Sequence, residues 1–117
     1  MVRYEEAPDL KIRAKEIADK LNFKHLDFNR IFFYRYSCKT RTIAKVIGFP
    51  KALRLPFPEI EPYYVIVVNE HNFSRLNKKE QDQTLLHELL HIPKNFSGEY
   101  SKISHAKIRY LSKVLLK

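Results

Sequence analysis

Apolar residues recur at steps of three and four near the start of the chain, at Leu10, Ala14, Ile17, Ala18 and Leu21. In a helix this spacing gathers them on one face and leaves the polar residues on the other. Asp9 is placed to cap the start of such a helix, and Asn22 marks its end. We therefore predict a helix from Asp9 to about Asn22 that packs on a sheet.

Three later segments have the composition of β-strands. Residues 31–38 and 42–47 are rich in aromatic and β-branched side chains, and we predict that they pair as a hairpin through residues 39–41. Residues 63–69 contain an unbroken stretch of Val and Ile that is typical of a strand covered on both faces, so we predict that this strand is central. Four prolines interrupt regular structure before it, namely Pro50, Pro56, Pro58 and Pro62.

Two helices are predicted in the last third of the chain. Asn77 with Glu80 three residues later has the spacing of a capping box, and this helix should run to about Ile92, where Pro93 stops it. Apolar residues at helical spacing predict a last helix over residues 100–116. The order of helix, strands, helix and helix predicts an α+β fold with a short mixed or antiparallel sheet.

Length and composition narrow the class of protein. The 117 residues fit one domain, residues 1–117, and the hydrophobic fraction of 44% is enough for a buried core. Cys38 is the single cysteine, and no segment has the pattern of a signal peptide, so we expect a cytoplasmic location. The longest apolar run, residues 63–68, is far shorter than the roughly 20 residues that cross a bilayer, so we expect no membrane span.

The charge is strongly basic and unevenly distributed. Lys and Arg outnumber Asp and Glu by 22 to 13, and the segment from Arg30 to Arg54 contains seven basic residues and no acidic one. Such a segment can bind a nucleic acid or an acidic polypeptide by electrostatic attraction. It can equally be a solvated face of a basic protein. Both interpretations stay open at this point.

The sharpest chemical signal is the motif HExxH, formed by His87, Glu88 and His91 inside the predicted helix. Residues four apart lie above one another on a helix, so both imidazoles can bind one metal ion. Glu88 is displaced by about 100° around the helix, which keeps it off the metal but within reach of a water bound there. The alternative is that these are ordinary helix histidines with a solvated acid between them.

Zinc is the metal that this motif usually binds, and it lowers the pKa of its bound water to about 7. Glu88 would then act as general base, taking a proton from that water and passing it to the leaving amine. The apolar residues around the motif would hold its helix in the core and lower the local dielectric constant.

A catalytic zinc usually has three protein ligands and one open position. Downstream of the motif the candidates are His105 and Glu99, and we favour His105 because Glu99 follows after only eight residues that include a Pro and a Gly. Tyr100 and Tyr110 are candidates for a hydrogen bond to the oxyanion of a hydrolytic intermediate, although most tyrosines only pack. We assign no site role to the isolated residues His25, His71 and Cys38.

These residues support a family resemblance. The apolar run 63–69, the segment LLHELLHIP, Gly98 and His105 resemble the metallopeptidases of phage and archaeal type, and these are similar to SprT-like and other minimal zincin domains. The resemblance covers about residues 31–110. It implies a small zincin-like domain with His87, His91 and His105 on zinc. The spacing after HExxH differs from that of metzincins, and no Met-turn is present.

The sequence therefore predicts a zinc-dependent metallopeptidase that acts on a polypeptide. In zincins of this kind an edge strand binds the substrate backbone, and residues 42–47 are our candidate for it. Two alternatives come from other classes of function. One is a basic nucleic-acid-associated module with a structural metal site, and the other is an ImmA-like regulatory protease that cuts a repressor. The sequence leaves the oligomeric state open.

Overall fold

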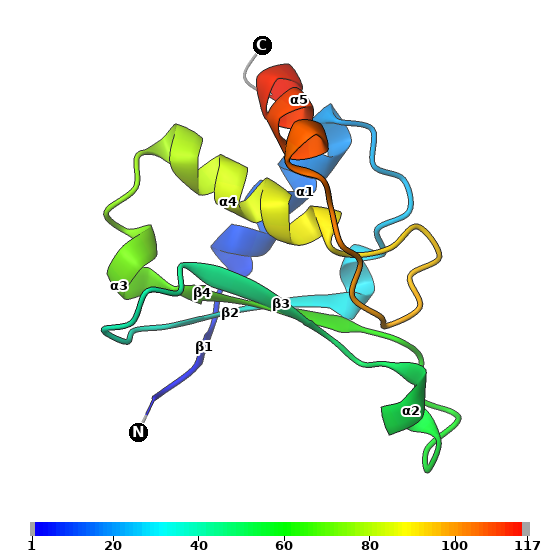
Figure 1. The fold of residues 1–117 in the computed structure, drawn as a ribbon. Helices are drawn as coiled ribbons and strands as arrows, with labels where there is room; N and C mark the ends of the chain where they lie inside the picture. The colour runs from blue at the N-terminus through cyan, green and yellow to red at the C-terminus, as the bar shows by residue number, and fades with distance from the viewer. Residues whose placement is uncertain (1, 116–117) are drawn as a thin grey trace.

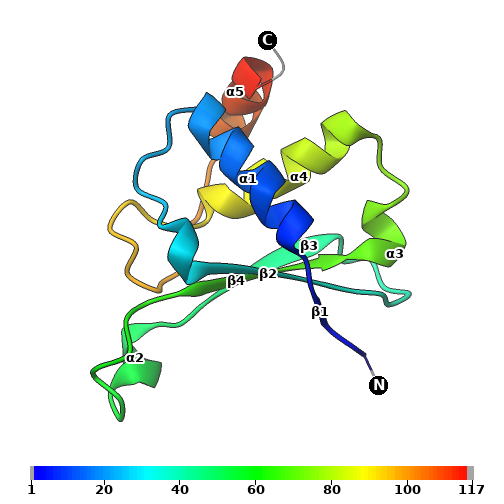
Figure 2. The same ribbon diagram turned by 180° about the vertical axis from the view of Figure 1, so that it is seen from behind.

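A four-stranded mixed sheet carries three helices on one of its faces (Figures 1 and 2). The computed structural model describes residues 2–115. Its elements are β1 (Glu5–Glu6), α1 (Pro8–Lys20), the 3-10 helix η1 (Phe28–Arg30), β2 (Ile31–Tyr36), β3 (Ala44–Gly48), α2 (Lys51–Arg54), β4 (Tyr64–Asn69), α3 (Glu70–Phe73), α4 (Lys78–Leu90) and α5 (His105–Leu115). The predicted α+β class is confirmed. The longer helices α1, α4 and α5 lie on the same side of the sheet.

The strand order is β1-β2-β4-β3, so the predicted central position of β4 is confirmed. β4 pairs in parallel with β2 and antiparallel with β3. The predicted hairpin between β2 and β3 is therefore wrong, because the two strands lie on opposite sides of β4. The buried side chain of Asn69 explains how the connection crosses over, since its amide binds the backbone of Cys38 at 2.9 and 3.0 Å and the carbonyl of Thr42 at 3.0 Å.

The core lies between the sheet and the helices, and alternate strand residues supply it. Ile31 and Phe33 of β2 lie beside Tyr64, Ile66 and Val68 of β4, and all are buried. The helices contribute buried apolar residues at helical spacing, namely Leu10, Ala14, Ile17, Ala18, Leu85, Leu86 and Leu89. Burying one such leucine or isoleucine stabilises the fold by about 1.5–3 kcal/mol, so this layer fixes the position of α4 on the sheet.

Helix α1 begins differently from the prediction. Its N-cap is Ala7 and Pro8 occupies the first turn, where a proline needs no hydrogen-bond partner. Asp9 therefore lies inside the helix, and its carboxylate accepts two hydrogen bonds from Arg35 at 2.8 and 3.0 Å. The predicted end near Asn22 is confirmed, because Asn22 adopts a left-handed conformation (φ 59°) directly after the helix.

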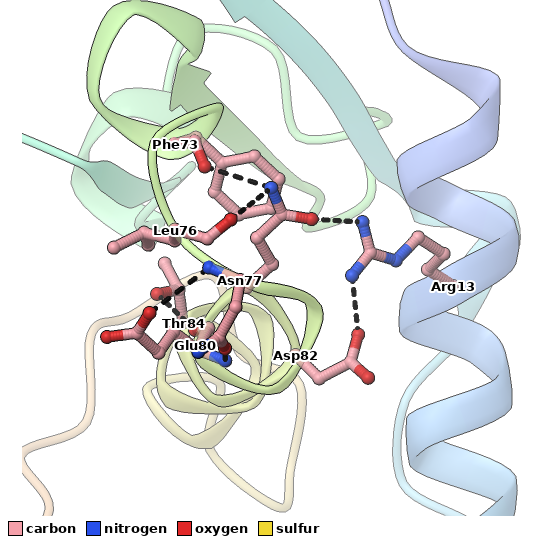
Figure 3. Close-up of polar contacts among 8 residues, drawn as sticks. Arg13, Phe73, Leu76, Asn77, Glu80, Asp82 and Thr84 are labelled. Atoms are coloured by element: carbon pink, nitrogen blue, oxygen red, sulfur yellow. Dashed lines mark hydrogen bonds and ion pairs between the residues drawn. The ribbon is translucent and has the colours of Figure 1, made fainter.

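The predicted capping box of α4 is confirmed (Figure 3). The side chain of Asn77 accepts from the Glu80 amide at 2.9 Å, and the Glu80 carboxylate accepts from the Asn77 amide at 3.1 Å. Arg13 of α1 donates to Gln81 at 2.9 Å and to Asp82 at 2.7 Å, which ties the two helices together. The helix ends at Leu90, two residues before the predicted Ile92.

Helix α5 begins at His105, five residues later than predicted, and residue 116 of the predicted helix lies outside the described residues. Residues 101–104 before it have no regular secondary structure, and the amide of Ser101 donates to the carbonyl of His91 at 2.8 Å. Ser104 then caps the helix by accepting from the Lys107 amide at 3.1 Å.

Within residues 2–115 no helix has the length and apolar character needed to cross a membrane.

Candidate metal and catalytic site

The end of α4 brings together the three residues of the HExxH motif. The ring centroids of His87 and His91 lie 4.8 Å apart. Glu88 and His91 are buried, with exposed fractions of 8% and 9%, and His87 is half-buried. The last turn of α4 therefore gathers two imidazoles and a shielded carboxylate, as the spacing of the motif requires.

The imidazole of His91 is held by two partners from the segment after α4. Its Nδ1 lies 2.7 Å from the backbone carbonyl oxygen of Ser101, and its Nε2 lies 2.9 Å from the hydroxyl of Tyr100. A carbonyl can only accept, so Nδ1 carries the proton and Nε2 presents its lone pair. Metal-binding histidines are commonly oriented by such a carbonyl, and Nε2 is then the nitrogen available to a metal.

Burial changes the acid–base properties of Glu88. Desolvation raises the pKa of its carboxyl from 4.5 to about 7, and the backbone amide of Val46 opposes this shift only in part. A carboxylate whose pKa is near neutrality can both accept and release a proton at physiological pH. Glu88 therefore has the properties of a general base and acid.

The electrostatics of His87 favour its neutral form. Burial lowers the pKa of His87, and the nearby His91 and His105 lower it further. Neutral imidazole is the form that binds a metal. His87 therefore stays available as a ligand over a wider range of pH than an exposed histidine would.

The two candidates for a third ligand lie at different places. His105 is the exposed first residue of α5, near enough to influence the pKa of His87. Glu99 is directed toward α2, where its carboxylate accepts from the Lys51 amide at 3.3 Å. Within residues 2–115 no three His, Cys, Asp or Glu side chains converge closely enough to hold a metal ion. Of the predicted ligands, the structure brings His87 and His91 together.

Two glycines anchor the segment that carries Tyr100 and Ser101. A Cβ atom on Gly48, at the end of β3, would lie 2.1 Å from the carbonyl oxygen of Gly98, so the two backbones are in direct contact. The hydroxyl of Tyr64 accepts from the Gly98 amide at 2.9 Å and donates to the carbonyl of Glu99 at 2.8 Å. Sequence analysis missed this contact, although Gly48 and Gly98 are the only two glycines of the chain.

A cleft of about 840 Å³ opens beside the motif. It lies between the start of β3, one side of α4 and one side of α5, and His87 and Glu88 line it. Tyr100 and Tyr110 are both exposed, and neither lines this cleft. The cleft gives a molecule of peptide size access to the base of the candidate site.

One wall of the cleft is formed by residues 41–44, which lead into β3, an edge strand of the sheet. The carbonyl of Ile43 accepts from the Asn69 amide of β4 at 2.8 Å. Because hydrogen bonding alternates along an antiparallel pair, Ala44 and Val46 direct their backbone groups away from β4. The influence of the Val46 amide on Glu88 agrees with this direction. Among the described residues, β3 therefore has one backbone edge that pairs with no other strand, and its Val46 amide faces the carboxyl of Glu88.

Comparison with known protein families agrees with this geometry. A family model described as putative phage metallopeptidase matches residues 2–112. The chain belongs to this family. The predicted resemblance to phage-type metallopeptidases is thus confirmed, and membership of the family implies a metal-dependent peptidase with a polypeptide substrate. Comparison with curated proteins and with solved structures gave no match.

Proposed function

We propose that this member of the phage metallopeptidase family is a zinc-dependent peptidase with Glu88 as general base. The observation that carries the proposal is the pairing of a buried Glu88, whose pKa is raised to about 7, with His91, whose Nε2 lone pair is directed by Ser101. These are the two functions that HExxH chemistry requires, a base and an oriented ligand.

The side chains suit zinc, and we propose His87, His91 and His105 as its ligands. Nitrogen donors of neutral imidazoles are typical of catalytic zinc sites. When bound, zinc would lower the pKa of a coordinated water and polarise the carbonyl of the substrate. His105 would have to move toward His87 and His91 to complete the ligand set, because the three side chains do not converge in the described residues. The buried carboxylate of Glu88 supplies the proton acceptor beside them.

Glu88 moves the proton during the reaction. Its carboxylate takes a proton from the attacking water and then donates it to the nitrogen of the departing amine. Burial raises the pKa of Glu88 in the metal-free protein, which makes its carboxylate a stronger proton acceptor than an exposed one. The low exposure of Glu88 excludes bulk water, which would otherwise compete for the proton.

The edge of β3 and the hydroxyl of Tyr100 would position the substrate. An extended peptide that adds to β3 would form backbone hydrogen bonds with Ala44 and Val46, and its scissile bond would lie near Glu88. The hydroxyl of Tyr100 lies 2.9 Å from His91 Nε2 and outside the lining of the cleft, so it would turn toward the substrate only when a metal takes that nitrogen. We propose that it donates to the carbonyl oxygen of the substrate as negative charge develops there.

A combined test of metal content and proteolysis checks the proposal. Protein purified without chelators is expected to contain about one zinc ion per chain, since one pair of HExxH histidines is present. The Glu88→Gln variant should keep this zinc and lose at least about 100-fold in the rate of casein cleavage. The His105→Ala variant should lose both zinc and activity. Full proteolytic activity in Glu88→Gln would show that another group is the base.

The nucleic-acid alternative has less support from the basic segment 30–54. Three of its seven cations are engaged inside the protein. Arg30 pairs with Asp27 and Glu61, Arg35 pairs with Asp9 and Glu70, and Arg54 donates to the carbonyls of Phe49 and Ser97. These contacts give three of the seven cations a structural role. An ImmA-like action on a single repressor is a narrower form of the peptidase proposal, which cleavage of one host protein instead of casein would indicate.

A further inference from the structure

The walls of the cleft carry four basic side chains from three different elements. Arg41 comes from the connection that leads into β3, Lys79 from α4, and Arg109 and Lys113 from α5. All four are exposed, and within residues 2–115 none of them forms an ion pair or a side-chain hydrogen bond. Their charges are therefore available to a molecule that enters the cleft.

The two acidic residues of the cleft do not balance this charge. They are outnumbered two to one by the four cations, and the carboxylate of Glu80 is held in the capping box, where it accepts from the Asn77 amide at 3.1 Å. Glu88 is buried, so the exposed rim of the cleft carries four cations and one carboxylate, that of Glu80. A concave site lined by charges of one sign concentrates the electric field and attracts ligands of opposite charge.

We propose that this cleft selects polypeptide segments rich in Asp and Glu near the bond that is cut. The inference rests on the proposed peptidase function and names its class of substrate. An extended peptide on the edge of β3 would alternate its side chains between the cleft walls and solvent. Carboxylates at alternate positions would then approach Arg41 on one wall, and Lys79 or Arg109 on the other.

The backbone edge favours a peptide over a nucleic acid as the occupant. Ala44, which lines the cleft, directs both its amide and its carbonyl away from β4, and a peptide backbone satisfies both kinds of group. A phosphodiester backbone only accepts hydrogen bonds, so it would leave the carbonyls without a donor. The combination of a free strand edge with cationic walls therefore matches an acidic peptide.

Two neighbouring lysines provide a matched pair of variants. Lys78 and Lys79 are both exposed in the first turn of α4, but only Lys79 lines the cleft. Replacing either by Glu changes the net charge equally and favours the start of the helix equally. Lys107 and Arg109 form a second pair on α5, because Lys107 lines a different pocket, next to His25.

The first measurement is cleavage of a peptide library prepared from whole-cell protein, with the cut sites read by mass spectrometry. We expect Asp and Glu to be enriched within three residues of the cut. A cleaved sequence is then synthesised with Glu or with Gln at those positions. The Glu peptide should have a kcat/KM at least about five-fold higher at low salt, and the difference should shrink at 0.5 M salt because the charges are exposed.

The variants then locate the effect. Lys79→Glu and Arg109→Glu should each lower kcat/KM for the Glu peptide about two- to five-fold, the usual size of one exposed ion pair, and leave the Gln peptide unchanged. Lys78→Glu and Lys107→Glu should change neither peptide. Equal cleavage of the Glu and Gln peptides would overturn the inference while leaving the peptidase function intact, and so would equal losses in Lys78→Glu and Lys79→Glu.

A binding measurement separates the inference from the proposed catalysis. The Glu88→Gln variant should bind a fluorescent Glu peptide more tightly than its Gln counterpart, as measured by anisotropy, whether or not either peptide is cleaved. If no peptide is cleaved by the wild type, the peptidase proposal fails, and this binding preference alone decides the inference. Binding of a single-stranded oligonucleotide at the cleft more tightly than the Glu peptide would overturn it in favour of a nucleic-acid ligand.

Discussion

The proton of His91 is held on Nδ1 by a backbone carbonyl, and this detail determines what the other nitrogen can do. The carbonyl of Ser101 lies 2.7 Å from Nδ1, so Nε2 keeps its lone pair. In this structure the hydroxyl of Tyr100 donates to that lone pair at 2.9 Å, and the two rings stack with centroids 4.3 Å apart. A metal ion on His91 would have to replace this hydrogen bond. Tyr100 and the metal therefore compete for one nitrogen.

This competition gives a prediction for Tyr100→Phe. Phenylalanine keeps the stacked ring but removes the hydroxyl, so zinc no longer has to displace a hydrogen bond worth about 0.5–1.5 kcal/mol. We expect zinc affinity to increase by roughly two- to ten-fold, measured by competition with a chelating dye. Casein cleavage should fall about 100-fold, because the proposed oxyanion donor is lost.

A rise in zinc affinity together with a fall in casein cleavage would indicate that the hydroxyl of Tyr100 both competes with the metal and takes part in the reaction. A purely structural role would lower zinc affinity and activity together. Tyr110→Phe is the control, because Tyr110 is 67% exposed on α5, and neither quantity should change. A loss of zinc affinity in Tyr100→Phe would contradict the competition at Nε2.

At the scale of elements, the site depends on a loop as much as on the helix that bears the motif. Helix α4 is fixed by its capping box, its buried leucines and Arg13 of α1. The loop between α4 and α5 supplies Tyr100 and Ser101, and it is anchored where Gly98 crosses the end of β3. The orientation of the His91 ring therefore depends on a contact between two segments about fifty residues apart in the sequence.

This anchoring predicts a double effect of Gly98→Ala. Gly98 has φ +90°, and an added Cβ would lie 2.2 Å from the carbonyl oxygen of Phe49, so both strain and a backbone clash are introduced. We expect the free energy of unfolding to fall by at least about 2 kcal/mol, measured in urea. Zinc affinity should also fall, because the carbonyl of Ser101 is displaced from His91.

The control for this substitution lies in the same loop. Asn95 is exposed, and Asn95→Ala should change stability by less than about 0.5 kcal/mol. If Gly98→Ala were as stable as the wild type and bound zinc equally well, the loop between α4 and α5 would not be what orients His91.

For the whole molecule, local signals predicted much more of the structure than long-range ones did. The capping box of Asn77 and Glu80 and the proximity of His87 to His91 follow from helix geometry alone, and both were predictable. The placement of β3 beyond β4 was not, because it depends on Asn69 holding a distant connection. The partner of His91 is a backbone carbonyl, which no residue identity in the sequence reveals.

Burial of Glu88 links the site to the stability of the whole fold. In the unfolded chain a glutamate ionises near pH 4.5, whereas in the folded, metal-free protein the pKa of Glu88 is raised to about 7. The contribution of Glu88 to stability is thus fully retained below about pH 4.5 and is lost as the pH rises to about 7 and beyond. At pH 8 the buried negative charge should cost the metal-free protein up to about 3 kcal/mol.

The Glu88→Gln variant should remove this cost, because glutamine has nearly the same shape and does not ionise. In urea unfolding with a chelator present, we expect the variant to exceed the wild type by about 1–3 kcal/mol at pH 8 and to equal it near pH 4.5. The other titrating groups are common to both proteins, so their contributions cancel in the difference. With saturating zinc the advantage should shrink, since a nearby cation stabilises the carboxylate. If the difference in the free energy of unfolding between the two proteins stayed constant from pH 4.5 to 8, Glu88 would have the same pKa in the folded and unfolded chain. Burial would then not raise the pKa of Glu88 toward neutrality.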